Sequence, residues 1–209
     1  MDKINVLIVE DDPDWINTIA DLLQHEDDII VKAKATNRAD AFTLAKNQLF
    51  DVILMDINLE GNRLDGIYAA AEISEISKAK ILMVTSLSEN EVILNSFIAG
   101  AINYIPKGNL SEVARAIRTA KADNSPYKVL LKEFNRLKKD EQLEKLTTSE
   151  KHIYYLLEKG FSRKNVLERL YISENTLKIH IRRIIKKLGV SKIQDAIKKV
   201  NRKGLFNNH

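Results

Sequence analysis

The 209-residue chain contains no cysteine. This absence excludes a disulfide framework and any zinc site built on thiolates. The chain also lacks an uninterrupted apolar stretch long enough to span a bilayer. Its first residues lead directly into an apolar strand pattern, without the basic, apolar and small-residue regions of a secretion signal. We therefore expect a cytoplasmic protein with no membrane partner.

The composition, with 44% hydrophobic and 30% charged residues, is that of a folded globular protein. The charges are unevenly distributed. Residues 1–120 hold 11 Lys/Arg and 19 Asp/Glu, a net charge of −8, whereas residues 121–209 hold 22 and 10, a net charge of +12. This asymmetry predicts two domains, an acidic one that could hold a cation and a basic one suited to nucleic acid. The alternative is two surfaces that merely differ in their solvated charges.

Strand and helix patterns alternate five times in residues 1–122. This alternation predicts a parallel five-stranded sheet with five helices covering both faces and right-handed crossovers. The expected strands are residues 4–9, 29–35, 52–55, 80–84 and 101–105. The expected helices begin after the Asp12–Pro13 cap, at Arg38, near Ile67, at a capping box in Ser88–Glu91 and near Leu110.

Acidic residues follow two of these strands. Val52–Met55 ends in Asp56, and the strand at residues 4–9 runs into Glu10, Asp11 and Asp12. The carboxyl ends of parallel strands share one edge of the sheet, where such folds bind ligands. Carboxylates do not gather without a cation, so we expect Mg²⁺ there, with Asp12 mainly capping a helix.

The fourth and fifth strands end in Thr85 and Lys107, which add a hydroxyl and an ammonium group to this edge. A lysine can neutralise a phosphate as a point charge. A carboxylate beside a metal can attack a phosphoryl group and form an acyl phosphate. The combination predicts phosphoryl chemistry at Asp56.

With these acids, hydroxyl and lysine at the strand ends, residues 1–122 resemble the receiver domain of two-component response regulators, which has a flavodoxin-like fold. The resemblance implies that Asp56 accepts phosphate from a sensor histidine kinase. It implies that Glu10, Asp11, Asp56 and the backbone carbonyl of Asn58 bind Mg²⁺. It also implies that Lys107 pairs with the phosphate.

The same resemblance implies that Thr85 and Tyr104 form the switch that responds to phosphorylation. Two features depart from the receiver pattern. The interval from Asp56 to Gly66 is about two residues longer than usual, and Gly108 stands where many receivers have proline. We expect the loop beside Asp56 to be shaped differently from that of other receivers.

Residues 123–146 are predicted to form a mostly helical linker, because apolar residues recur there at roughly helical spacing and glycine is absent. The apolar residues are Leu130, Phe134, Leu137 and Leu143. This helix could pack on either domain or pair with a second copy of the chain.

Residues 147–209 are predicted to form four short helices in a helix-turn-helix arrangement. Thr147–Glu150 is a capping box, and Ser162 and Ser173 cap later helices. In the third helix, Glu174–Leu188, one stripe is apolar: Leu177, Ile181, Ile184 and Leu188. The opposite side carries Lys178, Arg182 and Lys186, which favours insertion into the major groove of DNA.

Residues 147–201 resemble a LuxR/NarL (FixJ) type DNA-binding domain, above all in Ile172–Ile181. The resemblance implies base contacts from Lys178, Ile179 and Arg182, and phosphate contacts from Thr176 and Arg183. The last helix is a dimer surface in this family, and the stripe available for it is Ile193, Ala196, Ile197 and Val200. Alternatively, this stripe packs on the core of its own domain.

Together these features predict a response regulator transcription factor, not an enzyme, that binds double-stranded DNA as a homodimer. A Mg²⁺-dependent phosphatase with an aspartyl nucleophile is one alternative, but such enzymes need a second Asp where Asn58 stands. A regulator that binds DNA independently of phosphorylation is the other. The intact acids, hydroxyl and lysine argue against it.

Overall fold

The computed structural model describes residues 3–59, 64–122 and 128–202. The chain forms two compact units, Met1–Lys132 and Glu133–His209, and the division between them falls within the predicted linker. The finer domain limits at 122 and 147 remain predictions. Among the described residues, no helix combines the length and apolar character needed to cross a membrane.

The first unit is a parallel sheet with strands in the order β2-β1-β3-β4-β5. The strands are β1 (Ile4–Val9), β2 (Ile29–Ala35), β3 (Val52–Met55), β4 (Lys80–Thr85) and β5 (Ala101–Pro106). The helices are α1 (Pro13–Gln24), α2 (Arg38–Asn47), α3 (Asp65–Ile76), α4 (Asn90–Ile98) and α5 (Val113–Lys121), preceded by the 3₁₀ helix η1 (Lys107–Glu112). The predicted α/β architecture is confirmed.

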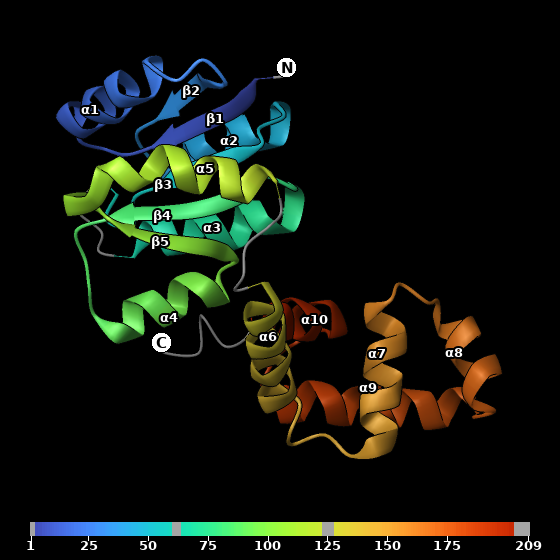
Figure 1. Cartoon of the computed structure of the whole chain (residues 1–209). Coiled ribbons are helices and arrows are strands. Elements are labelled where there is room, and N and C mark those ends of the chain that lie inside the picture. Colours follow the sequence, from blue (N-terminus) through green and yellow to red (C-terminus); the bar gives the residue numbers. More distant parts are fainter. Residues whose placement is uncertain (1–2, 60–63, 123–127, 203–209) are drawn as a thin grey trace. The chain divides into compact units, whose positions relative to one another are not determined.

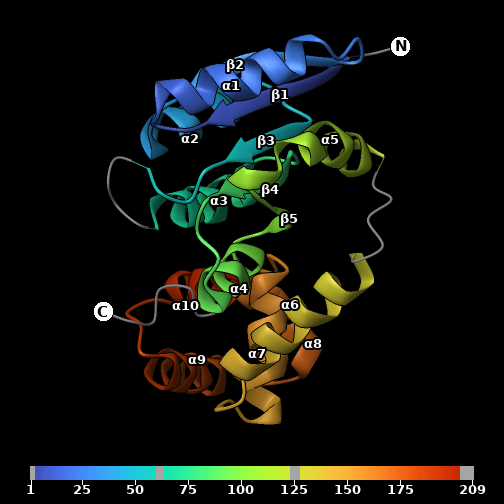
Figure 2. The same cartoon turned by 60° about the vertical axis from the view of Figure 1, so that its left-hand side comes forward.

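Helices cover both faces of this sheet. Figures 1 and 2 show α1 and α5 on one face and α2 and α3 on the other, with α4 beside β5. The face under α1 and α5 holds a continuous apolar core, in which Ile19 and Ile117 meet strand residues such as Val6 and Leu54. All four residues of β3 are buried, as expected for a central strand covered on both sides.

Helix α1 begins as predicted. The Asp12 side chain accepts a hydrogen bond from the amide of Asp14, and Pro13 occupies the first turn. This cap starts the helix directly after Glu10 and Asp11. The chain therefore turns away from the sheet as soon as the acids have been placed at its edge.

The capping box predicted for Ser88–Glu91 is wrong, although a helix begins there. Helix α4 has no side-chain cap: the Glu89 carboxylate instead accepts a hydrogen bond from the amide of Ser88. The helix expected near Leu110 is present, but its first turn belongs to the 3₁₀ helix η1, which Asn109 interrupts one residue earlier (φ −125°, ψ 48°), and the α-helical part begins at Val113.

Gly66 lies against the end of β3. Its amide donates a hydrogen bond of 2.9 Å to the carbonyl of Ile57. A Cβ atom at this position would overlap the carbonyl oxygen of Asp56 and lie 2.7 Å from the Cα atom of Ile57. The close approach of α3 to the site therefore requires glycine. Residues 60–63 of the long loop before it lie outside the described residues.

The second unit is helical. Its helices are α7 (Thr148–Glu158), α8 (Arg163–Leu170), α9 (Glu174–Leu188) and α10 (Ile193–Asn201), and α6 (Lys128–Gln142) precedes them. Helix α6 agrees with the predicted helical linker. The chain after α6 joins the core of this unit through Leu143 and Leu146, which pack with Tyr154, Val166 and the apolar stripe of α9.

We predict that Gly66→Ala destabilises the first unit by about 3 kcal/mol, because the new Cβ would overlap backbone atoms of Asp56 and Ile57, which must move. The matched control is Gly108→Ala, since a Cβ there meets nothing within 4 Å. Urea unfolding monitored by the fluorescence of Trp15, the single tryptophan, measures both changes. Equal stability of the two variants would contradict the steric argument.

Candidate metal-binding site and nucleic-acid interface

The predicted acids meet at the carboxyl edge of the sheet. β1 and β3 are neighbours, with Val9 opposite Met55, so the residues that follow them lie together. Carboxylate oxygens of Glu10, Asp11 and Asp56 lie within 4.8 Å of one another. Glu10 and Asp56 are buried, with exposed fractions of 2% and 5%. The predicted convergence of these three residues is confirmed.

Lys107 provides the positive charge of this cluster. Its Nζ atom lies 2.6 Å from Glu10 Oε2 and 2.9 Å from Asp56 Oδ2. Burial lowers the pKa of the Lys107 ammonium, but the hydrogen bonds to both acids outweigh this effect and raise the pKa above its usual value. Burial raises the pKa of Glu10 to about 7, although the bond from Lys107 opposes this rise, and the charge of Asp56 adds to it.

The donor set fits a hard divalent cation. Three carboxyl groups face one ammonium, so the cluster can still accommodate positive charge. Oxygen ligands of this kind suit Mg²⁺. Asp56 Oδ1 accepts a hydrogen bond of 2.7 Å from the amide of Ile57, which fixes the orientation of the carboxylate. Asn58, whose backbone carbonyl is the further predicted ligand, is an exposed residue that directly follows the buried Ile57.

The predicted switch residues converge on one residue of the loop between β4 and α4. The buried Thr85 hydroxyl accepts a hydrogen bond of 3.4 Å from the amide of Leu87. The hydroxyl of the half-buried Tyr104 donates to the carbonyl of the same Leu87. Burial, together with the charges of Glu89 and Asp56, raises the pKa of Tyr104 to about 12. The phenol therefore remains a donor at neutral pH.

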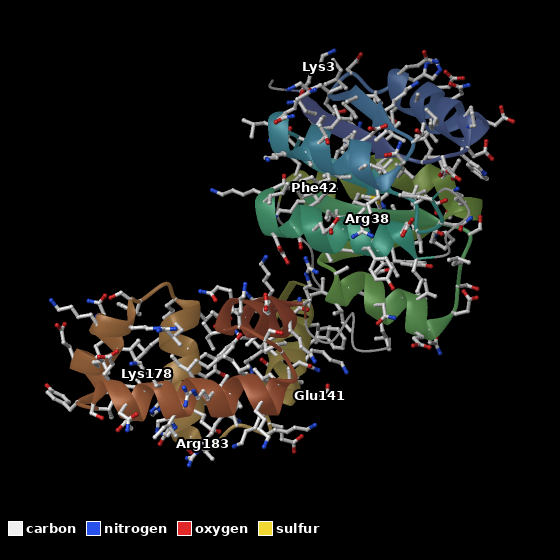
Figure 3. The ribbon with its side chains drawn as sticks, turned by 180° about the vertical axis from the view of Figure 1, so that it is seen from behind. Lys3, Arg38, Phe42, Glu141, Lys178 and Arg183 are labelled. Carbon is white, nitrogen blue, oxygen red and sulfur yellow. The ribbon has the colours of Figure 1, made fainter. Side chains whose placement is uncertain are left out.

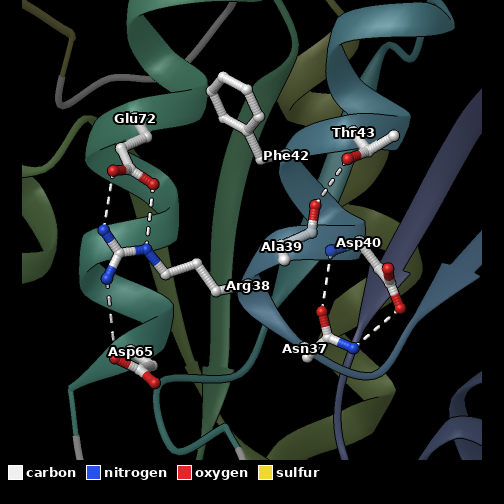
Figure 4. Close-up of a pocket in the computed structure, with 8 residues that line it drawn as sticks. All are labelled: Asn37, Arg38, Ala39, Asp40, Phe42, Thr43, Asp65 and Glu72. Carbon is white, nitrogen blue, oxygen red and sulfur yellow. Dashed lines mark hydrogen bonds and ion pairs between the residues drawn. The ribbon is translucent and has the colours of Figure 1, made fainter.

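An arginine cluster that the sequence did not reveal joins α2 to the start of α3. Arg38 donates to both carboxylate oxygens of Glu72, at 3.0 and 2.7 Å, and lies 3.9 Å from Asp65 (Figure 4). Its guanidinium also lies over the ring of Tyr68, 5.5 Å from the centroid. These contacts hold the helix that begins next to Gly66. Arg38 and Asp65 belong to separate elements, so no local pattern links them.

Helix α9 presents the predicted amphipathic arrangement. Its apolar stripe is buried: Leu177, Ile181, Ile184 and Leu188. Lys178, Arg182 and Arg183 are exposed, and Ile179 is 40% exposed between them. Lys178 and Arg183 are labelled on this helix in Figure 3. An exposed apolar side chain within a cationic surface is suited to a thymine methyl group in a DNA groove.

The start of α9 is well defined. The Ser173 hydroxyl accepts a hydrogen bond of 3.1 Å from the amide of Thr176, so the predicted cap is confirmed. The Thr176 hydroxyl lies 2.9 Å from that of Ser173. His180 is half-exposed, and its buried Nδ1 atom has no hydrogen-bond partner among the described residues.

One lysine of α9 has a structural role that the sequence did not reveal. Lys187 Nζ lies 2.6 Å from Oε2 of Glu150, which is 1% exposed. The same carboxylate accepts a hydrogen bond of 2.9 Å from the amide of Thr147 and completes the predicted capping box. Burial tends to raise the pKa of Glu150, but the bonds from Lys187 and Thr147 lower it below its usual value. The pair joins α7 to α9.

The predicted dimer stripe on α10 lies mostly inside its own unit. Ile193, Ala196 and Val200 are buried in the core, and Ile197 packs against that core while partly exposed. This placement corresponds to the alternative that the stripe packs on its own domain. An amphipathic pattern shows that a helix has an apolar neighbour but does not identify that neighbour.

Comparison with known proteins assigns both units. The model of the response regulator receiver domain matches residues 6–118, and that of the bacterial regulatory proteins of the luxR family matches residues 144–200. The chain is 34% identical over 212 residues to the transcriptional regulatory protein LiaR of Bacillus subtilis, covering 98% of this chain and all of that protein.

Two further matches agree. The chain is 32% identical over 199 residues to the response regulator protein VraR of Staphylococcus epidermidis, covering 93% of this chain and 94% of that protein. A LuxR-family two-component response regulator from Aurantimonas sp. has a similar solved structure, with a TM-score of 0.54 and 26% identity, covering 65% of this chain and 99% of that one.

The pair between the half-buried Lys187 and the buried Glu150 gives a stability prediction. Glu150→Gln is expected to destabilise the second unit by about 1–3 kcal/mol at pH 7, because Lys187 loses its buried partner. Glu141→Gln is the control: it removes an equal charge from an exposed pair with Lys138 and should cost less than about 0.5 kcal/mol. Calorimetry measures both variants.

The destabilisation should depend on pH. A folded pKa below the ordinary value of 4.5 means that the Glu150 carboxylate stabilises the fold above that pH. This contribution is lost as the pH falls through the lowered folded pKa. The difference between wild type and Glu150→Gln should therefore shrink in acid, and a difference that is constant from pH 7 to pH 3 would contradict the role of the ion pair.

Proposed function

The chain belongs to the response regulators of two-component systems that join a receiver domain to a LuxR-type DNA-binding domain, and we propose that phosphorylation of Asp56 by a sensor histidine kinase controls its binding to DNA. The observation that supports this most directly is the position of Lys107, whose ammonium lies between Glu10 and Asp56 within the acidic cluster. The cluster combines carboxylates that can hold a metal ion with an ammonium group that can neutralise a phosphoryl group, and phosphoryl transfer uses both.

In the proposed reaction, a carboxylate oxygen of Asp56 attacks the phosphorus of a phosphohistidine on the kinase. A P–O bond forms, the P–N bond breaks, and its electron pair leaves with the imidazole nitrogen. The bond from the Ile57 amide orients the Asp56 carboxylate for this attack. Lys107 moves from the carboxylate oxygen to an oxygen of the phosphoryl group and neutralises its charge.

Glu10, Asp11 and Asp56 would hold Mg²⁺, with the carbonyl of Asn58 as a further ligand. The ion would supply charge neutralisation for the phosphoryl oxygens. With the ion bound, Glu10 and Asp56 would have a positive partner in addition to Lys107. The ammonium then becomes available for the phosphoryl group.

Leu87 offers a physical link between Thr85 and Tyr104 in the proposed switch. If the Thr85 hydroxyl turns toward the phosphoryl group, the Leu87 amide loses its acceptor. The loop can then shift and withdraw the carbonyl that holds the Tyr104 hydroxyl. The two side chains therefore change together through one peptide segment, a local rearrangement of the kind that alters a docking surface.

In the second unit, α9 would enter the major groove of double-stranded DNA. Lys178, Ile179 and Arg182 are the proposed base contacts, and Thr176 and Arg183 the proposed phosphate contacts. Lys178, Ile179, Arg182 and Arg183 are exposed away from the buried stripe, which supports this assignment, and Thr176 is half-buried at the start of the helix. Lys187 is excluded from the contact set because it holds Glu150.

We further propose that DNA is bound by a dimer, so that two copies of α9 meet half-sites about one helical turn apart. Three of the four apolar positions of α10 are occupied within the core. Of that stripe, only Ile197 leaves partly exposed apolar surface for a second copy.

The first test concerns the phosphoacceptor. Incubation with a small phosphodonor and Mg²⁺ should add the mass of one phosphoryl group, and Asp56→Asn or removal of Mg²⁺ with a chelator should abolish the addition. Asp12→Asn is the matched control, because asparagine also caps helices and Asp12 lies outside the three-acid cluster. Intact-mass spectrometry measures the product. Unchanged phosphorylation of Asp56→Asn would refute the assignment.

The second test concerns DNA recognition. A binding site is first selected from random duplexes with the phosphorylated protein. Arg182→Ala should then weaken binding about 5- to 150-fold and relax the preference at one base pair, as loss of a base contact does. Lys46→Ala removes an equal charge from an exposed position on α2 and should change affinity less than twofold. Fluorescence anisotropy at fixed salt measures both. If both substitutions weakened binding equally, the loss would reflect the charge of the protein and not a base contact, and the assignment of Arg182 would be refuted.

A further inference from the structure

Trp15 is an aromatic residue beside the reactive edge that the proposed reaction does not yet use. It lies in the first turn of α1, three residues after the capping Asp12. Its neighbours Ile16 and Ile19 are buried in the core, whereas Trp15 is half-buried and is not among the core residues. The largest side chain of α1 is therefore not used to fill the sheet's core.

The Trp15 ring instead faces the lysine of the site. Lys107 Nζ lies 4.9 Å from the ring centroid, within the range of a cation–π interaction. Lys107 is only 8% exposed, so its ammonium has few water molecules to replace a lost partner. Cation–π attraction is strongest for a cation that has been desolvated in this way.

Glu10, Asp56 and Trp15 all contact the Lys107 ammonium, but the proposed reaction would affect them differently. Glu10 and Asp56 are the carboxylates that would be engaged by the metal and the phosphoryl group. The Trp15 ring carries no oxygen atom or charge with which to ligate Mg²⁺ or neutralise a phosphoryl group, so neither event needs to displace its contact with the ammonium. It is therefore the neighbour that can hold the ammonium while the other two exchange.

We propose that Trp15 is a positioning residue for phosphoryl transfer. Its ring face holds the Lys107 ammonium over Asp56 while that ammonium passes from carboxylate oxygens to the phosphoryl group. This inference rests on the proposed function of Asp56. It adds that the rate of transfer depends on an aromatic ring at position 15, and that the dependence acts through Lys107.

The test compares Trp15→Leu, which keeps an apolar side chain but loses the ring, with Trp15→Phe, which keeps a ring. The initial rate of phosphorylation by a small phosphodonor at saturating Mg²⁺ is followed by intact-mass spectrometry. Trp15→Leu should slow the reaction about fivefold, equivalent to about 1 kcal/mol, and Trp15→Phe should remain within twofold of wild type. Mg²⁺ affinity, measured by calorimetry, should be unchanged in both.

A double-mutant cycle with Lys107→Met tests whether the effect passes through the lysine. Trp15→Leu should slow the reaction no further in the Lys107→Met background. An equal fivefold loss in both backgrounds would overturn the proposal, as would a Trp15→Leu rate equal to wild type. Equal losses of rate in Trp15→Leu and Trp15→Phe would also overturn the proposal. If phosphorylation of Lys107→Met is too slow to measure, this comparison of the two Trp15 variants is the deciding one. If wild type is not phosphorylated at all, the proposed function itself fails.

Discussion

The ammonium of Lys107 at the carboxyl edge of the sheet is the interaction on which the first unit's site depends. It lies between two buried carboxylates that would otherwise face each other without compensation. The arrangement exists only because β1, β3 and β5 all end at the same edge. The site is therefore stabilised by a pairing that would have to rearrange in the proposed reaction, which is a suitable basis for a switch.

The second unit contains a similar pair with a different consequence. Glu150 and Lys187 also form a carboxylate–ammonium contact, in which the carboxylate is buried and the lysine half-buried, but the carboxylate is simultaneously part of a helix cap. The pair joins two helices and leaves the exposed cations of α9 for other partners. The same kind of interaction connects two helices in the second unit, whereas in the first unit it is the contact that the proposed reaction would rearrange.

Two similar sequence patterns show how far local rules reach. Thr147–Glu150 and Ser88–Glu91 both have the spacing of a capping box, yet only the first forms one. In the first, Lys187 from a distant helix meets the capping carboxylate and keeps it buried. In the second, the residues are exposed, and Glu89 bonds to its neighbour Ser88 instead. A cap with a marginal intrinsic advantage forms reliably when a tertiary contact supports it.

The sequence alone determined the five strands of the first unit, the apolar stripe of α9 and the meeting of three acids with a lysine. These features follow from hydrophobic periodicity and from the geometry of parallel strands, which are properties of short segments. Only the tertiary structure decided that Lys187 anchors Glu150, that α10 packs inward, and that Thr85 and Tyr104 meet at Leu87. Each of these depends on which distant segment lies opposite a side chain, and that choice is made by packing of the whole domain.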